Sequence, residues 1–205
     1  TDESTRFLNG TLDDLRAYNR ALSAAEVTKL YGQSRGAKTG VAPPTPANLM
    51  SGLVGYWTFD GKNTNWRTQQ VVDISGTGNT GTMSGMSTSS SPVSAKLGQG
   101  LLYDGVNDLI TVADADSLDL TTDISISLWM KARINVDASL VNKGLNGYNF
   151  GTQSDGKLFW GKTGVDSVVS NSTIVLGRWY HVVATRTCGT NTIYIDGVSD
   201  NSAAK

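Results

Sequence analysis

The stretch "NGTLDDLRAYNRALSAAEVTKLYG", residues 9–32, joins a strand pattern to the start of a helix. Side chains along a regular strand alternate between its two faces, so Leu12 would lie opposite Leu15 and Ala17. A bulge at Asp13-Asp14 brings all three to one side. We therefore predict a bulged strand, which needs a larger sheet to bury its apolar face.

The residues after this strand predict a short, capped helix. In "LSAAEV", Ser23 takes the N-cap position and Glu26 follows three residues later, the spacing of a capping box. Leu22 and Val27 are placed for a hydrophobic staple across this cap. Gly32 predicts the end of the helix after about two turns.

A connector follows the helix. Residues 35–50, "RGAKTGVAPPTPANLM", hold three prolines among small residues, which favours an extended and semi-rigid linker over an ordinary surface loop. We therefore divide the chain into a strand-helix unit at residues 1–36, a linker at 37–50 and a main body at 51–205.

The main body has the pattern of an all-β protein. "DISISLWMKAR" alternates, and "LGQGLLYDGVNDLITV" predicts a hairpin between residues 101–103 and 109–112. The apolar face of the first segment comprises Ile124, Ile126, Leu128 and Met130, and the other face comprises Ser125, Ser127, Trp129 and Lys131. Strands recur roughly every 8 to 12 residues with Gly, Asn and Asp between them and without βαβ alternation. The pattern predicts an antiparallel two-sheet sandwich.

The composition excludes some partners. The 205 residues carry a formal net charge of −1 and only 17% are charged, so no electrostatic attraction to nucleic acid or to an anionic membrane is expected. No apolar run approaches the ~20 residues that insertion into a membrane needs. Cys188 is the single cysteine, so no intrachain disulfide can form.

The main body resembles the LamG-like jelly roll (concanavalin A-like, laminin-G-type). The matching phrases follow one another over nearly all of residues 51–198: "GLVGYWTFDG", "DISGTGNTGT", "LGQGLLYDGVNDLITV", "DISISLWMKA", "LVNKG", "GKLFWG", "GRWYHVVATR" and "IYIDGV". The family's closing phrase is similar to "FLNGTLDDLRAYNRALSAAEVTKLY", residues 7–31, which here stands first. After residue 205 the family would supply one more strand and then this ending.

Two arrangements follow from the displaced ending. Residues 1–36 either close the sheet of their own chain or complete that of a neighbouring copy. The Pro-rich linker and a tandem-repeat origin favour the second arrangement, in which donated strands would string copies together.

The same jelly roll houses glucanases, but this chain lacks their carboxylate pair. Retaining hydrolysis needs two carboxyl groups about 5 Å apart. The two glutamates, Glu3 and Glu26, lie outside the main body, and its aspartates mostly fall in turns. His181 has no accompanying Ser or Cys signature and is expected to be a packed side chain rather than a general base. Cys188 is expected to be an inert thiol. We therefore expect no catalytic residues and no enzyme activity.

Calcium is the expected cofactor. Ca²⁺ needs six to eight oxygens, and Asp60, Asp73 and Asn79 lie among glycine-rich turns. The resemblance implies a structural ion that ties this region to the closing "DD" strand, which adds Asp14. The alternative is that Asp73 and Asn79 only cap turns.

Carbohydrate recognition would use aromatic faces. Trp66 lies in a polar loop, whereas Tyr148 and Trp160 alternate with residues expected in the core. The alternative for each of the three is that its ring packs inside the protein and does not contact a ligand. The resemblance implies a secreted or cell-surface module that binds carbohydrate or a cell-surface glycoconjugate in adhesion. One alternative is a structural repeat of a surface fibre or adhesin, assembled with neighbouring copies by strand donation through residues 1–36. The other is an accessory domain of a polysaccharide-degrading enzyme.

Overall fold

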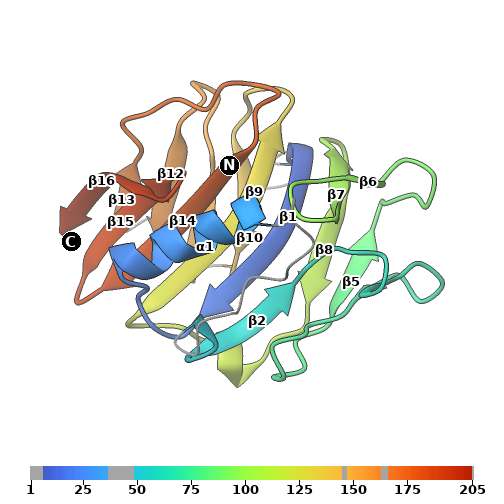
Figure 1. Ribbon diagram of the computed structural model, residues 1–205, viewed down its shortest axis with the longest axis horizontal. Helices are drawn as coiled ribbons and strands as arrows, with labels where there is room; N and C mark the ends of the chain where they lie inside the picture. The colour runs from blue at the N-terminus through green and yellow to red at the C-terminus, as the bar shows by residue number, and fades with distance from the viewer. Residues whose placement is uncertain (1–6, 37–48, 145–146, 163–165, 205) are drawn as a thin grey trace.

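The alternating segments form a two-layer antiparallel β sandwich in a computed structural model, which describes residues 7–36, 49–144, 147–162 and 166–204 (Figure 1). The first layer is one sheet in the order β16-β15-β14-β9-β1-β7-β6, with β2 paired to β1. Its strands are β1 Asn9–Tyr18, β2 Leu53–Trp57, β6 Pro92–Ser94, β7 Gln99–Asp104, β9 Ile124–Ala132, β14 Tyr180–Thr187, β15 Thr190–Ile195 and β16 Val198–Ala204.

The second layer consists of two four-stranded sheets, in the orders β10-β11-β12-β13 and β3-β4-β5-β8. Their strands are β3 Thr64–Asn65, β4 Gln70–Val71, β5 Gly81–Ser84, β8 Leu109–Val112, β10 Ala138–Asn142, β11 Tyr148–Thr152, β12 Leu158–Lys162 and β13 Asp166–Val169. A 3₁₀ turn at Asp116–Leu118 precedes β9. The all-β antiparallel architecture predicted from the sequence is confirmed.

The N-terminal strand β1 lies in the middle of the first sheet. It pairs with β9 on one side, and with β7 and then β2 on the other. The register shifts between Asp13 and Arg16, and Asp14 has a φ of 57°. This is the predicted bulge, and it lets Leu12, Leu15 and Ala17 all contact the main core.

Donation of residues 1–36 to a neighbouring copy was expected, and the structure shows otherwise. Strand β1 closes the sheet of its own chain, with hydrogen-bonded partners along both of its edges. Loop-closure entropy rises only slowly with length, so a connector of this size allows a local closure that buries the apolar side of β1. Most of the predicted linker, residues 37–48, lies outside the described residues.

Both faces of strand β9 are buried. The predicted apolar face packs in the main core, where Ile126 is 1% exposed. Ser125, Ser127 and Trp129 point away from that core, as predicted, but they are also buried. The reason is that helix α1, Ala24–Gly36, crosses this outer face of the sheet (Figure 1). A second, smaller cluster that includes Tyr18, Val27 and Leu30 holds the helix there.

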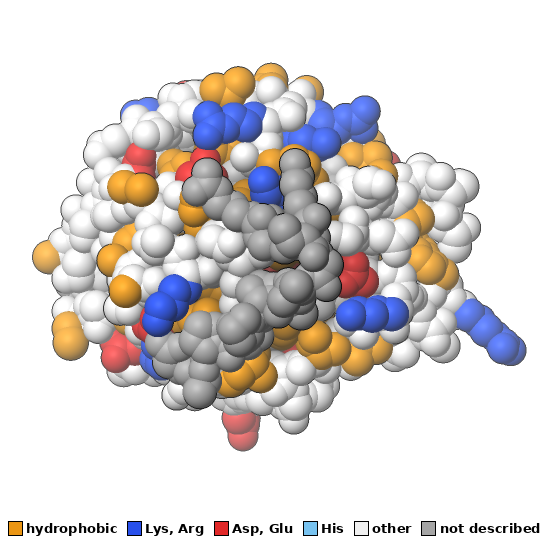
Figure 2. Space-filling view, viewed as in Figure 1, with side chains coloured by type: hydrophobic (Ala, Val, Ile, Leu, Met, Phe, Trp, Pro, Cys, Tyr) orange, Lys and Arg blue, Asp and Glu red, His pale blue; other side chains and the backbone are white. Residues whose placement is uncertain are grey.

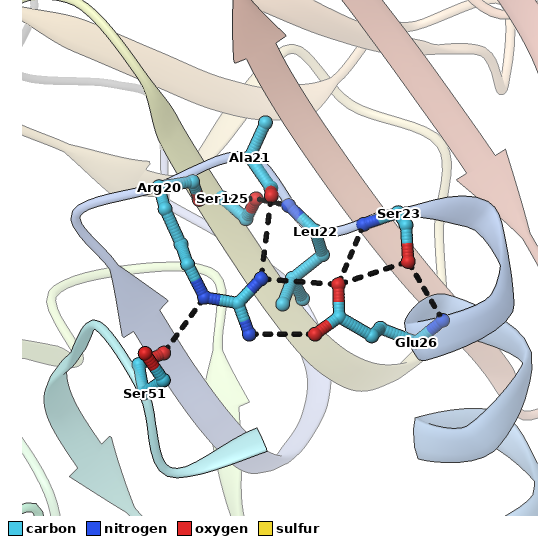
Figure 3. Close-up of polar contacts among 7 residues, drawn as sticks. All are labelled: Arg20, Ala21, Leu22, Ser23, Glu26, Ser51 and Ser125. Carbon is cyan, nitrogen blue, oxygen red and sulfur yellow. Dashed lines mark hydrogen bonds and ion pairs between the residues drawn. The ribbon is translucent and has the colours of Figure 1, made fainter. Parts of the chain in front are cut away.

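The predicted capping box begins helix α1 (Figure 3). The Ser23 backbone N–H donates to Glu26 Oε2 at 2.9 Å, and the Glu26 N–H donates back to Ser23 Oγ at 3.3 Å. Arg20 adds two hydrogen bonds to the same carboxylate, at 2.7 and 3.0 Å. The predicted stop at Gly32 is wrong, because the helix continues to Gly36. An exposed helical glycine costs only about 1 kcal/mol, which tertiary packing of the helix offsets.

The predicted hairpin between residues 101–103 and 109–112 is also wrong. Strand β7 pairs with β1 and β6, whereas β8 pairs with β5 in the other layer. The Asp108 carboxylate accepts the Asp104 N–H at 2.9 Å, and Gly105 has a φ of 82°. This corner turns the chain from one layer into the other.

The surface shows no single dominant charge. On the face seen in Figure 2, basic, acidic and hydrophobic side chains are interspersed. Within the described residues, no helix combines the length and apolar character that crossing a membrane requires.

Candidate functional site

A cavity of about 350 Å³ lies at one end of the sandwich, between the first sheet and the β10–β13 sheet. We call it the end cavity. Its apolar wall includes Ile124, Tyr148 and Trp160. Its charged and polar lining includes Asp119, Lys143, Lys162, Arg186 and Asn191.

The polar residues that line the end cavity occupy strand positions at which the alternation predicts core residues. Trp160, Ala184 and Ile193 are buried in the main core. Side chains two residues apart on a strand share a face, so Lys162, Arg186 and Asn191 point into the same interlayer space. Polar residues that break a core pattern are typical of functional sites.

Asn191 is the most unusual of these residues. Its side chain is fully buried, and neither its Oδ1 nor its Nδ2 has a hydrogen-bond partner in the described structure. A buried polar group without a partner destabilises a fold by about 1–3 kcal/mol. The amide therefore offers two donors and an acceptor to a molecule that enters the cavity.

Lys143 bridges two aspartates at the cavity mouth. It contacts Asp114, and it lies 3.1 Å from Asp119 Oδ1. The hydrogen bond with Asp114 raises the pKa of Lys143, so this ammonium group is charged at neutral pH.

Two of the predicted aromatic ligand residues come together at the end cavity. The rings of Tyr148 and Trp160 lie 6.3 Å apart at 45°. Both belong to the core, and the Trp160 indole N–H donates to the Thr185 carbonyl at 3.0 Å. Trp66 is half-buried against the core near the β3–β4 turn and lines neither of the two cavities described here.

A second cavity, of about 450 Å³, separates the two halves of the second layer and is lined by β8 and β10. We call it the interlayer cavity. In the described sheets β8 pairs only with β5, and β10 only with β11, so the other edge of each strand lacks a partner strand. Lys143 and Tyr148 line both cavities.

The structure brings two of the four predicted calcium ligands together. Asp73 accepts hydrogen bonds from the backbone of Tyr56, Ser75 and Asn79. Burial alone would raise the pKa of Asp73, but these bonds outweigh it and lower that pKa. The Asn79 amide donates to the Val54 carbonyl at 2.7 Å. This pair therefore holds a turn.

The other two predicted ligands lie apart from this turn. Asp14 accepts the Tyr56 hydroxyl at 2.7 Å and pairs with Arg16 at 3.0 Å. Asp60 accepts the Gln99 N–H at 2.9 Å. No group of three or more His, Cys, Asp or Glu side chains suited to a metal occurs in residues 7–36, 49–144, 147–162 and 166–204.

Asp13 was not among the calcium ligands predicted from the sequence, but it shares a structural role with Asp60. Its Oδ2 accepts the Leu97 N–H at 2.7 Å, so Asp13 and Asp60 hold the same turn. Its Oδ1 is buried without a described partner. Burial raises the pKa of Asp13 to about 8. The Leu97 hydrogen bond lowers this pKa, and the negative charges of Asp14 and Asp60 raise it further. The bulge turns Asp13, rather than Asp14, toward this turn.

The residues that were considered for catalysis, His181, Glu26 and Cys188, have the following surroundings in the structure. His181 is 2% exposed, and its Nε2 lies 3.0 Å from Ser127 Oγ. Burial, followed by the charge of Arg16, lowers the pKa of His181 to about 3. Glu26 caps helix α1, and Cys188 is exposed. His181 is thus the packed side chain that the sequence predicts.

Comparisons with known proteins give a family match for part of the chain. A family model described as the concanavalin A-like lectin/glucanases superfamily matches residues 104–205, so the closing phrase at residues 7–31 lies outside the match. A solved structure, residues 221–444 of an S-layer domain-containing protein from Clostridium thermocellum, is 20% identical, with a TM-score of 0.40. The similarity covers 73% of this chain and 71% of that one. A search of curated proteins found no match.

Proposed function

We propose, since residues 104–205 belong to the concanavalin A-like lectin/glucanases superfamily, that this chain is a non-catalytic LamG-like module that binds carbohydrate. The unpaired amide of Asn191 in the end cavity carries the proposal. A volume of about 350 Å³ falls within the range of roughly 300–1,000 Å³ typical of small-molecule sites.

The lining suits a sugar ring. Its hydroxyls can pair with the Asn191 amide, and its C–H face can pack on the aromatic wall beside Tyr148. Burial raises the pKa of Tyr148 to about 12, so the phenol stays protonated and remains a donor at neutral pH.

Substitution of Asn191 by Leu tests the site. Leu is of similar size but cannot hydrogen-bond, so Asn191→Leu should weaken glycan binding about tenfold or more. Asn149→Leu is the matched control, because Asn149 is also buried with an unpaired Oδ1 but lines neither cavity. A glycan array followed by calorimetry measures both variants. If the unsubstituted chain binds no glycan, the proposed function is wrong.

The proposed setting is outside the cell or at its surface, where glycoconjugates are displayed. The module would act there in adhesion, or as the accessory domain of a polysaccharide-degrading enzyme. Surface labelling of the intact source cells with an antibody against residues 49–205 tests the location.

A second candidate function is assembly with a neighbouring copy through the interlayer cavity. The free edges of β8 and β10 are the observation that favours it, because unpaired strand edges accept an added strand. The inserted strand would come from an edge of the other copy, since β1 is already paired within its own sheet. Light scattering after size exclusion should then show a dimer that dissociates on dilution. A monomer at all concentrations removes this candidate.

A structural calcium ion is proposed at Asp13 and Asp60. The buried, unpaired Oδ1 of Asp13 fits a cation ligand, and two carboxylates that hold one turn supply part of the six to eight oxygens needed. EDTA should lower the melting temperature and Ca²⁺ should restore it. Binding adds about 2.7 kcal/mol when the free ion is 100-fold above its Kd. Asp13→Asn should abolish this response, and an unchanged melting curve of the unsubstituted chain would exclude the ion.

A further inference from the structure

We infer that the interlayer cavity binds the hydrocarbon chain of a small, uncharged molecule. The proposed carbohydrate site is the end cavity, so this is a second binding site, for a ligand of different chemistry. Three features of the interlayer cavity lead to it: its length, its apolar lining, and the partners that its charged groups already have within the protein.

The interlayer cavity follows the strands of the divided layer. Residues 109–113, which include all of β8, and residues 139–143, which include most of β10, line it from the second layer. Leu12, Leu15 and Ala17 of β1 line it from the first sheet. Five residues of a strand span about 13–16 Å at roughly 3.3 Å per residue. The cavity is therefore elongated, which suits an extended chain better than a single compact ring.

The middle of the interlayer cavity is apolar. From the first sheet it is lined by Leu12 and Ile126, which are both buried in the main core. From the second layer it is lined by Ile110, Val112 and Leu140, which are half-buried and pack against the same core. Water enters such a space reluctantly, because each water molecule needs two to four polar partners.

Leu15 marks the part of the core that stays uncovered. It lies on β1 in the middle of the first sheet and packs against the main core, yet it is only half-buried. Leu12 and Ala17, on the same face of β1, are buried. An apolar molecule in the cavity would remove Leu15 and the half-buried side chains of β8 and β10 from water, which is the main source of affinity for such a ligand.

The charged residues of the described lining already have partners within the protein. At one end of the cavity, the Asp108 carboxylate accepts the Asp104 N–H at 2.9 Å. At the other end, Lys143 pairs with Asp114 and Asp119. Nothing in this lining therefore calls for a charged ligand, and an uncharged molecule fits it best.

The volume sets the size of the ligand. A cavity of about 150 Å³ lined by apolar side chains holds one benzene ring. The interlayer cavity, at about 450 Å³, has room for roughly three groups of that size in a row. A strand inserted from another copy would lie in the plane of the second layer, between the free edges of β8 and β10. A hydrocarbon chain instead fills the space between the layers, next to Leu12 and Ile126.

Fluorescence titration of the intact chain with N-phenyl-1-naphthylamine, followed by displacement with 1-hexanol, 1-octanol and 1-decanol, tests this site. Affinity should rise about threefold to fourfold per added methylene, the gain from moving one CH₂ group out of water. Decanoate, which carries a negative charge at neutral pH, should bind no tighter than decanol. If light scattering shows a dimer that none of these probes enters, another copy occupies the cavity and the inference is wrong.

Two matched substitutions test whether the chain lies in the interlayer cavity. Val141 lines this cavity, so Val141→Trp should fill part of it and weaken decanol binding about tenfold or more. Val93→Trp is the control, because Val93 is also half-buried on an edge strand, β6, but lines neither cavity. Ile110→Thr adds a hydroxyl to the apolar wall without added bulk and should weaken binding several-fold, even if Val141→Trp does not fold.

Asn191→Leu separates this site from the proposed carbohydrate site. Asn191 lines the end cavity and not the interlayer cavity, so its loss should leave decanol affinity unchanged. A large loss would place the hydrocarbon chain in the end cavity and overturn the inference. Absence of decanol binding, affinity that does not rise with chain length, or unchanged binding in both Val141→Trp and Ile110→Thr also overturns it. Each of these three outcomes leaves the carbohydrate proposal standing, because that proposal depends on glycan binding alone.

Discussion

The two layers of the sandwich differ in continuity. The first sheet runs unbroken from β16 to β6, with the N-terminal strand β1 in its middle (Figure 1). The opposite layer is divided between β8 and β10 by the interlayer cavity. Strand β1, from the start of the chain, joins β9 to β7, so the pairing of strands far apart in sequence determines which layer is continuous.

The difference extends to burial. The first sheet is covered on both faces near β9, by the main core on one side and helix α1 on the other. At the divided layer Ile110 of β8 and Leu140 of β10 are only half-buried. The comparison therefore predicts large effects for substitutions in the first sheet and small effects at the divide.

The largest effect is expected at the centre of the first sheet. Ile126 is 1% exposed, so Ile126→Ala should lower the free energy of unfolding by ~2–5 kcal/mol through lost burial and a new cavity. Urea denaturation measures it, with Val198→Ala, at a position 70% exposed, as a control within about 0.5 kcal/mol of the unsubstituted chain. A loss at Ile126 as small as the control's would mean that β9 has the wrong register.

The outer face of the same sheet should respond to acid. Burial lowers the pKa of His181 from 6.5 to about 3, so the unfolded chain binds more protons between these values and stability falls as the pH drops below 6.5. The slope from this one group is at most about 1.4 kcal/mol per pH unit. Urea denaturation from pH 7 to 4.5 should show a steeper loss for the unsubstituted chain than for His181→Gln. Parallel slopes would mean that His181 is solvated beneath helix α1.

The cap of helix α1 should contribute less. Glu26→Ala removes the capping box and the Arg20 contacts, and should lower the free energy of unfolding by about 1–2 kcal/mol. The hydrogen bonds from Arg20 lower the pKa of Glu26 to about 2, so this contribution is present above pH 4.5 and is lost as the pH falls toward 2. Glu26→Gln keeps hydrogen-bonding oxygen at the cap and should lose less. Equal losses for both variants would assign the effect to the charge alone.

Local patterns in the sequence predicted the parts of the fold that depend on neighbouring residues. The bulge at Asp13-Asp14 follows from the spacing of Leu12, Leu15 and Ala17, and the cap follows from Ser23 and Glu26. Non-local pairing was not predictable in this way. The turn after β7 has the sequence of a hairpin, yet the chain crosses to the other layer, because β1 already pairs with β7.

The candidate site was only partly predictable for the same reason. Tyr148 and Trp160 were selected as aromatic residues, but the polar lining of the end cavity was not. One signal was available: in "NTIYI", Asn191 shares a face with Ile193, so a polar side chain occupies a core-facing position. Whether such a residue finds a partner depends on the facing sheet, which no local pattern specifies.

The smallest effect is expected where the second layer divides. Ile110→Ala deletes the same atoms as Ile126→Ala, but Ile110 is half-buried and lines the interlayer cavity. Less apolar surface returns to water, and the deletion enlarges an existing opening rather than creating a closed void, so the loss should be about 1 kcal/mol or less. Urea denaturation of the two isoleucine variants under one set of conditions measures the contrast directly. A loss at Ile110 that matches the loss at Ile126 would mean that β8 and β10 are covered in solution, as they would be by a strand inserted from another copy.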